Sequence, residues 1–307
     1  MSIVRSAWLS IPLLSISYSV HAVDKERLKE LAQKYAPILY LHPDEPYQPT
    51  SMENQLSYLA LYKKGSEEPL MKNLTMEDFE SFVQSTNDTE NYQLKIARDT
   101  KNARAGNVKE ARCYTNPHLV QFKNKTLIQI PYLFYYGYNG IPHSKNCVID
   151  CIIKKHQLGV HEGDWEGIVV LLDQNENIYG VHYSAHGYGE ARFYKKEGSR
   201  SLRKDDGYKL QDGRPMVFSA LETHASYNRV GNLTRRAHKN LKEILASKLH
   251  ILPPDRTGVG AKLDCKEPGK LEDFNLESEK TWAAFKGNYG GPTGPGGKDF
   301  WFGPLKK

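Results

Sequence analysis

The segment from His161 to Glu166, His-Glu-Gly-Asp-Trp-Glu, places three candidate metal ligands close together. Because successive side chains of a strand point to opposite faces, strand periodicity places Asp164 and Glu166 on one face and Trp165 on the other. Two carboxylates and an imidazole form a mixed oxygen and nitrogen set that suits Ca²⁺, Mg²⁺ or Mn²⁺, with Zn²⁺ as an alternative. The segment therefore predicts a divalent-metal site at His161, Asp164 and Glu166. A surface turn whose carboxylates cap backbone amides would have the same spacing.

Two later segments alternate polar and apolar side chains. Residues 181–187 read Val-His-Tyr-Ser-Ala-His-Gly, and residues 222–226 read Glu-Thr-His-Ala-Ser. On strands this alternation places the polar side chains on one face, which is simply solvated if the strand lies at an edge. If such strands converge on one cleft, they supply acid and base groups, for which the candidates are His186, His224 and Glu222.

Motifs of the common hydrolases do not occur in the sequence. It contains no Gly-x-Ser-x-Gly elbow and no His-Glu-x-x-His pair. Neither a serine hydrolase nor a zincin metalloprotease is therefore indicated. A hydrolase would have to act through the predicted metal instead.

The elements around these segments predict a mainly β fold. The run 127–136 suits buried strands interrupted at Pro131. Further β-rich runs are separated by Gly, Asn and Asp turns, a rhythm typical of a β-sandwich, and we expect a jelly-roll-like sandwich with peripheral α-helices. These runs cover residues 166–172, 178–185, 191–195 and 215–221.

Helices are expected at the periphery. Residues 24–35 carry apolar side chains at helical spacing, and residues 234–248 form the clearest later helix. A shorter helix over 75–83 begins with Thr75 as N-cap and Asp78 three residues on, in the manner of a capping box.

The first 22 residues have the pattern of a signal peptide. They contain a single early Arg and a short apolar region, and they end in Val-His-Ala. This pattern predicts cleavage near Ala22, and the alternative is an uncleaved N-terminal anchor. We therefore expect residues 23–307 to form a single domain that is secreted or delivered to the periplasm or the vacuolar lumen. No later stretch is long and apolar enough to span a bilayer.

The charge of the chain is only mildly basic. The formal net charge is +6, and it falls to about +5 because Arg5 leaves with the signal peptide. Such a charge favours weak attraction to acidic surfaces. It is too small to indicate nucleic-acid binding.

The four cysteines all follow the expected signal peptide. An even number of cysteines in an exported chain suggests disulfides, and three pairings exist. We expect Cys147 to pair with Cys151, closing a small loop, and Cys113 to pair with Cys265. A zinc role is less favoured because the Cys-x-x-x-Cys motif has no second pair to complete a tetrahedral site.

Five sequence blocks of the chain, spread over roughly residues 30–304, resemble the vacuolar protein sorting-associated protein 62 family. The Gly-Asp-Trp-Glu block at 163–166 is the most specific. The resemblance implies little chemistry, because the name of the family records a trafficking phenotype. The other blocks are Ala-Pro-Ile-Leu-Tyr-Leu-His-Pro-Asp-Glu-Pro-Tyr-Gln-Pro at 36–49, Phe-Tyr-Tyr-Gly-Tyr-Asn-Gly at 134–140, Ser-Ala-His-Gly at 184–187 and His-Ala-Ser-Tyr at 224–227.

The central block is also similar to the Gly-His-Arg-His-Asp-Trp-Glu signature of the necrosis- and ethylene-inducing peptide-like proteins. Those proteins are secreted cytolysins with a β-sandwich, a divalent metal and affinity for membrane sphingolipid headgroups. His161, Asp164 and Glu166 occupy the ligand positions of that signature. The departures bear on lipid specificity and toxicity more than on the metal, and they are Val160, Glu162 and Gly163.

These observations lead to three functional hypotheses. The first is a secreted, metal-dependent binding protein or toxin-like effector that recognises a membrane lipid headgroup or a glycan. The second is a metal-assisted hydrolase of a phosphoester or glycan, in which His186, His224 or Glu222 transfers protons. The third is a purely structural metal site in a trafficking-related protein.

Overall fold

The computed structural model describes residues 24–122, 125–140, 159–185, 207–233, 254–273, 282–291 and Pro295, and the backbone of residues 190–193. The expected signal peptide and the expected helix over 234–248 lie outside these residues. Cys147 and Cys151 also lie outside them. The described chain is mainly β, as predicted, with few helices.

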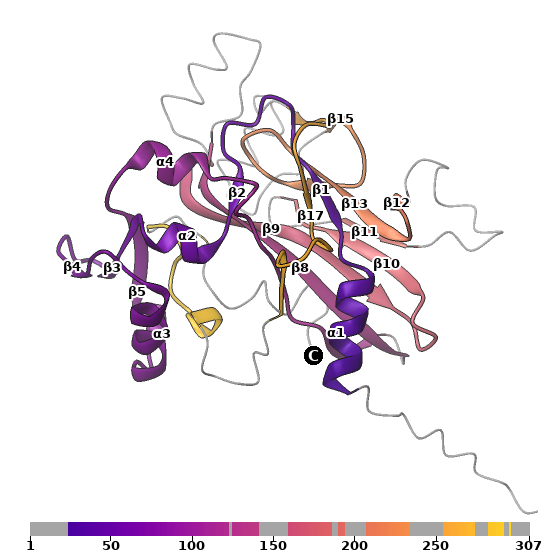
Figure 1. Ribbon diagram of the computed structural model, residues 1–307, viewed down its shortest axis with the longest axis horizontal. Helices are drawn as coiled ribbons and strands as arrows, with labels where there is room; N and C mark the ends of the chain where they lie inside the picture. The colour runs from indigo at the N-terminus through magenta and orange to yellow at the C-terminus, as the bar shows by residue number, and fades with distance from the viewer. Residues whose placement is uncertain are drawn as a thin grey trace, which may run out of the picture.

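The largest sheet of the described residues has eight strands. They are β2 (Pro49–Thr50), β6 (Cys113–Thr115), β7 (His118–Phe122), β8 (Lys125–Asn139), β9 (His161–Leu172), β10 (Ile178–Tyr183), β11 (Glu190–Phe193) and β18 (Leu271–Asp273). Their order is β11-β10-β9-β8-β6-β18, and β2 and β7 also pair with β8. The long antiparallel strands β8 and β9 form the centre of the molecule (Figure 1).

Strand β8 continues through Pro131, so the predicted interruption is wrong. On one side β7 pairs with β8 as far as Gln129, and β6 pairs with it from Tyr132 onward. Pro131 therefore falls in the gap between two partner strands, where a backbone N–H is not required.

A second sheet has five strands in the described residues, in the order β12-β13-β1-β17 with β14 paired to β13. Strands β1 and β13 are parallel, and the other pairs are antiparallel. A separate two-stranded ribbon is formed by β15 and β16. The bounds are β1 (Ile38–Tyr40), β12 (Leu210–Gln211), β13 (Arg214–Ser219), β14 (Ser226–Tyr227), β15 (Gly231–Leu233), β16 (Asp255–Thr257) and β17 (Lys262–Asp264).

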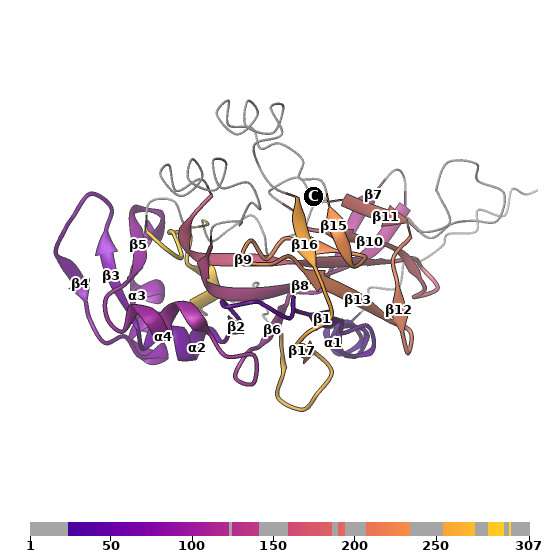
Figure 2. The ribbon, with the colours of Figure 1, turned by 90° about the horizontal axis from the view of Figure 1, so that it is seen from above.

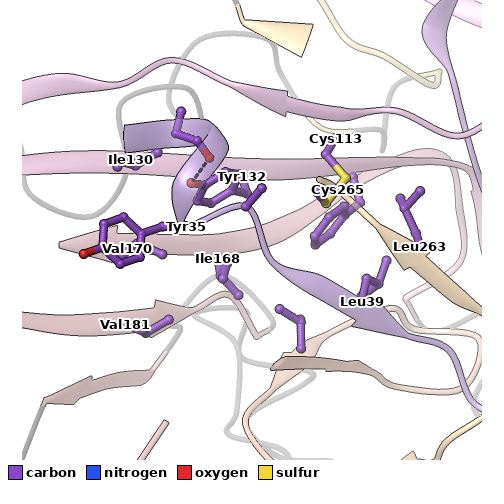
Figure 3. Packing of buried hydrophobic residues seen from close by; sticks show 14 of the residues in the cluster. Tyr35, Leu39, Cys113, Ile130, Tyr132, Ile168, Val170, Val181, Leu263 and Cys265 are labelled. Atoms are coloured by element: carbon purple, nitrogen blue, oxygen red, sulfur yellow. Dashed lines mark hydrogen bonds between the residues drawn. A yellow bond between two sulfur atoms is a disulfide. The ribbon is translucent and has the colours of Figure 1, made fainter. Parts of the chain in front are cut away.

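The second sheet packs over one face of the largest sheet. Leu39, Val217 and Leu263 of the second sheet share one buried cluster with Ile130 and Val170 of the largest sheet (Figure 3). Burial of apolar side chains between two sheets is the main stabilisation of such an arrangement. The molecule therefore contains a β-sandwich, as predicted.

Helix α1 (Lys25–Lys34) closes the side of this core, where the sequence predicts a helix. Leu31 and Ala32 are buried in the same cluster. The hydroxyl of Tyr132 donates a hydrogen bond of 2.7 Å to the carbonyl of Ala32, which fastens the helix to β8 (Figure 3).

The disulfide expected between Cys113 and Cys265 is present. Cys113 lies in β6 of the largest sheet, and Cys265 directly follows β17 of the second sheet. Both side chains are fully buried in the core (Figure 3). The bond therefore links the two layers of the sandwich.

A third sheet with three helices lies at one end of β8 and β9 (Figures 1 and 2). Thr75 caps α3 in a capping box with Asp78, as predicted. This third sheet and its helices contribute to a second buried cluster, which also contains Trp165 and Trp282. Its elements are α2 (Met52–Leu56), β3 (Leu59–Lys63), β4 (Pro69–Met71), α3 (Met76–Ser85), η1 (Thr89–Asn91), β5 (Tyr92–Ile96) and α4 (Thr100–Ala105), and η2 (Trp282–Ala284) packs against them.

Candidate functional site

The inward row of side chains on β9 changes from apolar to acidic. Val170 and Ile168 lie in the core between the two sheets, and the next positions of the same row are Glu166 and Asp164. Both are buried, with 9% and 7% of the residue exposed. Trp165 packs into the second cluster on the opposite face. The prediction that Asp164 and Glu166 share one face is therefore confirmed, and two carboxylates lie at the end of a hydrophobic core.

His224 joins this row to the N-terminal part of the chain. Its Nδ1 lies 3.0 Å from Oδ2 of Asp164, and its Nε2 lies 3.5 Å from Oε1 of Glu45. The imidazole is completely buried and also stacks on the ring of Tyr136. His224 therefore bridges two buried carboxylates from distant segments.

The two carboxylates keep His224 protonated. Burial by itself lowers the pKa of an imidazole, but the hydrogen bond to Asp164 and the nearby carboxylate of Glu45 outweigh it and raise the pKa of His224 to about 9. His224 is thus a cation at neutral pH. It compensates part of the negative charge in the cluster.

Glu166 has a different environment. The hydroxyl of Ser184 donates a hydrogen bond to Glu166 and in turn accepts one of 2.9 Å from the N–H of Gly167. Burial raises the pKa of Glu166 well above its ordinary value, and the nearby charge of Asp164 raises it further. A negative charge on Glu166 is therefore unfavourable unless a cation or a proton compensates it.

The turn between β13 and β14 holds His224 in a strained backbone conformation. Glu222 has φ +62° and His224 has φ +54°, in the left-handed region that non-glycine residues rarely adopt. The N–H of Glu222 donates a hydrogen bond of 2.7 Å to Oε2 of Glu45. The predicted strand alternation over 222–226 is therefore wrong, because residues 221–225 form a tight turn and β14 begins only at Ser226.

Asp255 extends the acidic cluster. It accepts hydrogen bonds from the hydroxyls of Thr223, at 2.9 Å, and Tyr227, at 2.6 Å. It is 2% exposed, and its charge also raises the pKa of Glu166. We call the buried acidic residues around His224 the acidic cluster; its members are Glu45, Asp164, Glu166, Glu222 and Asp255.

Gly163 determines the direction of the side chains at the start of β9. Its φ is +62°, and a Cβ at this position would lie 1.6 Å from the carbonyl oxygen of Tyr289, so only glycine fits. Glu162 accepts a hydrogen bond from the N–H of Ile96, which packs on the Trp165 side of the sheet. The strict alternation of side chains is therefore interrupted at Gly163, and Glu162 lies on the side of Trp165.

The predicted metal ligands are only partly assembled. Among the described residues, no group of three or more His, Cys, Asp or Glu side chains is arranged to hold a metal ion. Asp164 and Glu166 lie on one face, and Nδ1 of His161 lies 2.7 Å from the carbonyl of Gly163. Because a carbonyl only accepts, Nδ1 carries the proton and Nε2 of His161 has the lone pair that a metal would use. The donor types therefore fit a divalent cation.

Two of the three candidate acid and base residues lie near the predicted metal ligands. His224 and Glu222 lie in the acidic cluster, whereas His186 lies outside the described residues. Within the stretch 181–187, His182 pairs with Val169 on the outer face, while Ser184 follows the end of β10 and bonds Glu166. The predicted single polar face is therefore wrong, because the alternation ends where the strand ends.

Sequence reasoning missed Glu45 and Asp255. Both are acidic residues next to prolines in the sequence: Glu45 precedes Pro46, and Asp255, which begins β16, follows Pro254. Buried charged residues are rare unless paired, but burial is not visible in such a sequence. The signal that could have pointed to Glu45 is its place in the segment 42–49, whose three prolines restrict the backbone.

Comparison with known proteins identifies related sequences. The family model described as Vacuolar protein sorting-associated protein 62 matches residues 11–243. The protein of that name from Saccharomyces cerevisiae (strain ATCC 204508 / S288c) is 34% identical over 103 residues, which are 33% of this chain and 20% of the yeast protein. The matched part thus spans about a fifth of the length of that relative.

Solved structures give weaker likenesses. NLPPya in complex with glucosamine has 13% sequence identity and a TM-score of 0.35, and the match covers 83% of this chain and 74% of that chain. Necrosis and Ethylene inducing Protein 2 from the causal agent of cocoa's Witches Broom disease has 18% identity and a TM-score of 0.31, with 65% and 67% covered. Likenesses at this level carry no conclusion about ligand or function. No helix among the described residues is long and apolar enough to cross a membrane.

Proposed function

The chain belongs to the vacuolar protein sorting-associated protein 62 family, and from this premise we propose that it is a secreted binding protein whose divalent cation captures a membrane lipid headgroup or a glycan. The buried disulfide supports export, because such bonds persist in oxidising compartments. Cleavage of the chain near Ala22 is part of this proposal.

The observation that carries the proposal is the pair Asp164 and Glu166 at successive inward positions of β9. Two carboxylates buried on one face repel each other, and His224, which contacts Asp164 and Glu45 directly, compensates Glu166 only from a distance. A divalent cation between them would compensate the excess charge. In the proposed site Asp164 and Glu166 supply oxygen ligands, and Nε2 of His161 supplies a nitrogen ligand.

The number of protein ligands favours a binding role. Ca²⁺ takes six to eight ligands, and Mg²⁺ demands octahedral geometry. Three protein ligands leave several positions for other oxygen atoms. Hydroxyl groups of a sugar or oxygen atoms of a phosphate have the hard-donor chemistry that these ions prefer. The cation would thus hold the headgroup or glycan directly.

The geometry argues against His224 as the general base of the hydrolase alternative. A general base must be unprotonated near the working pH and must reach the proton that it removes. His224 is fully buried, and its two ring nitrogens face Asp164 and Glu45. Both nitrogens are thus directed at carboxylates, and neither is placed to take a proton from a metal-bound water. An entirely structural metal remains an outcome of the experiment below.

The test is calorimetric titration of Ca²⁺, Mg²⁺, Mn²⁺ and Zn²⁺ into chelator-treated protein comprising residues 23–307. We expect binding of one cation by the wild type and loss of binding in Asp164→Asn and Glu166→Gln. The exposed Glu67 in the β3–β4 hairpin gives a control, since Glu67→Gln removes one negative charge far from the site. Circular dichroism checks the fold of each variant.

The outcomes separate the hypotheses. Absence of cation binding by folded wild-type protein would overturn the metal site. Cation binding without any affinity for lipid vesicles or a panel of glycans would leave only a structural metal. Cation-dependent binding of either ligand class, lost together with the cation in Glu166→Gln, supports the proposal.

A further inference from the structure

Three residues from distant segments form an aromatic and cationic group beside the acidic cluster. They are Tyr47, between β1 and β2, Tyr138, near the end of β8, and Arg104, in α4. The rings of Tyr47 and Tyr138 are 4.9 Å apart in an edge-to-face arrangement, and the guanidinium carbon of Arg104 lies 4.3 Å from the centre of the Tyr138 ring. All three residues are partly exposed. We call these three residues the tyrosine–arginine group.

This group directly adjoins the acidic cluster. The N–H of Tyr47 donates a hydrogen bond of 2.9 Å to Oε1 of Glu45. A Cβ at Gly140 would lie 2.6 Å from Cε2 of Tyr47 and 3.0 Å from Cβ of Glu222, so both side chains pack closely against this glycine. The tyrosine–arginine group therefore lies directly beside Glu45 and Glu222 of the acidic cluster.

Arg104 differs from other arginines of the described chain in its partners. Arg214 forms two hydrogen bonds with the carboxylate of Asp264, at 2.5 and 3.0 Å, and Arg27 pairs with Glu176. Arg104 forms no ion pair with a carboxylate of the described residues, and its buried Nε has no hydrogen-bond partner there. Among the described residues, the direct contact recorded for its guanidinium is the face of Tyr138.

The chemistry of the group indicates its ligand. A guanidinium presents a planar set of donors that matches a carboxylate or a phosphate. Partly exposed tyrosine rings provide apolar faces with polar hydroxyls, which suits packing against a sugar ring. The position next to the proposed cation suits a ligand that has both hydroxyl groups and an anionic group.

We infer that Tyr47, Tyr138 and Arg104 form a subsite for an anionic sugar, in which the tyrosines contact the ring and Arg104 binds its carboxylate or phosphate group. The inference rests on the proposed function, because it specifies the class of ligand held beside the cation. Arg104 is a specificity-determining residue in this arrangement. A neutral sugar would lack a partner for its guanidinium.

The test compares charged and neutral sugars with protein comprising residues 23–307. Glucuronate, glucose 6-phosphate and glucose are titrated calorimetrically, with and without the cation that binds best. We expect the wild type to bind at least one of the two anionic sugars at least about tenfold more tightly than glucose, as one charge-assisted interaction would give. Arg104→Gln should abolish this difference, and Arg104→Lys should restore part of it. Lys101→Gln removes an exposed charge from the same helix and should have no effect.

A second arm identifies the source of the anionic group. Co-sedimentation with phosphatidylcholine vesicles, with and without phosphatidylinositol, tests a lipid headgroup. An Arg104-dependent preference for soluble sugars indicates a free or glycan-borne anion, and the same preference for phosphatidylinositol vesicles indicates a lipid. Equal affinity for charged and neutral ligands in both arms would overturn the inference.

The experiment distinguishes failure of the subsite from failure of the metal. Cation binding is measured in Arg104→Gln as well, and it should equal that of the wild type. A preference for anionic over neutral sugars that persists without any cation binding would support the subsite and overturn the metal site. Cation binding together with Arg104-independent sugar binding would retain the metal and overturn the subsite.

Discussion

The imidazole of His224 stacks on the phenol ring of Tyr136, with centroids 3.8 Å apart and planes only 6° from parallel. The stack holds the imidazole edge-on to Asp164 on one side and Glu45 on the other. One aromatic residue of the sandwich core thus orients the cation that joins two parts of the acidic cluster.

Replacement of His224 should be strongly destabilising. His224→Gln removes the positive charge and leaves Asp164 and Glu45 buried without their partner, so we expect a loss of about 3–5 kcal/mol in the free energy of unfolding. Urea denaturation at neutral pH measures it. Tyr136→Phe is the control, because it keeps the ring and removes only the hydroxyl bonded to Ser219, at a cost of about 1 kcal/mol. Similar losses in the two variants would contradict a charge-compensating role for His224.

Replacement of Glu166 should have opposite effects without and with cation. Glu166→Gln removes one of two neighbouring buried carboxylates, so the chelator-treated variant should unfold at a higher temperature than the wild type. The variant should lose the increase in Tm that the cation gives to the wild type. Differential scanning fluorimetry in chelator and in the preferred cation measures both. A variant with unchanged cation-induced stabilisation would show that Glu166 is not a ligand.

His182 predicts an acid-sensitive step in stability. Burial lowers its pKa from 6.5 to about 4, so the unfolded chain binds a proton more readily than the folded one. The free energy of unfolding therefore rises with pH between about 4 and 6.5. The loss of stability caused by His182 is complete below pH 4 and absent above pH 6.5. The effect amounts to about 3 kcal/mol. His182→Gln should reduce the loss of stability measured by urea denaturation between pH 7 and pH 4, and an unchanged pH dependence would refute the assignment.

Gly163 should not tolerate a side chain. Gly163→Ala places a methyl group against the carbonyl of Tyr289 and forces alanine into the left-handed region, and we expect a loss of more than about 2 kcal/mol. Gly65 is a matched control, since its φ is +84° and a Cβ there meets no atom within 4 Å. Gly65→Ala should cost about 1 kcal/mol, for backbone strain alone. Equal losses in thermal denaturation would show that the contact with Tyr289 contributes nothing.

Loss of the disulfide should loosen the sandwich. The bond closes a loop with a sequence separation of 152 residues, so the double variant Cys113→Ala and Cys265→Ala should lose about 2–5 kcal/mol. Urea denaturation of the variant and of the oxidised wild type measures the difference. Addition of a reductant to the unfolded wild type should reproduce the loss, whereas full stability of the double variant would exclude a stabilising role.

The sequence by itself determined features that depend on neighbouring residues. The capping box at Thr75 and Asp78, the strand periodicity that places Asp164 opposite Trp165, and the mainly β architecture were all predictable. Each depends on backbone geometry over a few residues, which side-chain type and spacing report directly. The Cys113–Cys265 bond was predictable as one of three pairings, because only four cysteines are present.

Only the tertiary structure decided which distant groups meet. Glu45 reaches the turn of Glu222 across 177 positions of the chain, and Tyr47, Tyr138 and Arg104 come together from three separate elements. The packing of the two sheets and the left-handed turn at 222–224 bring about these contacts. Periodicity assigns a side chain to a face of its own strand, but burial and electrostatic pairing depend on which segments the folded core brings together.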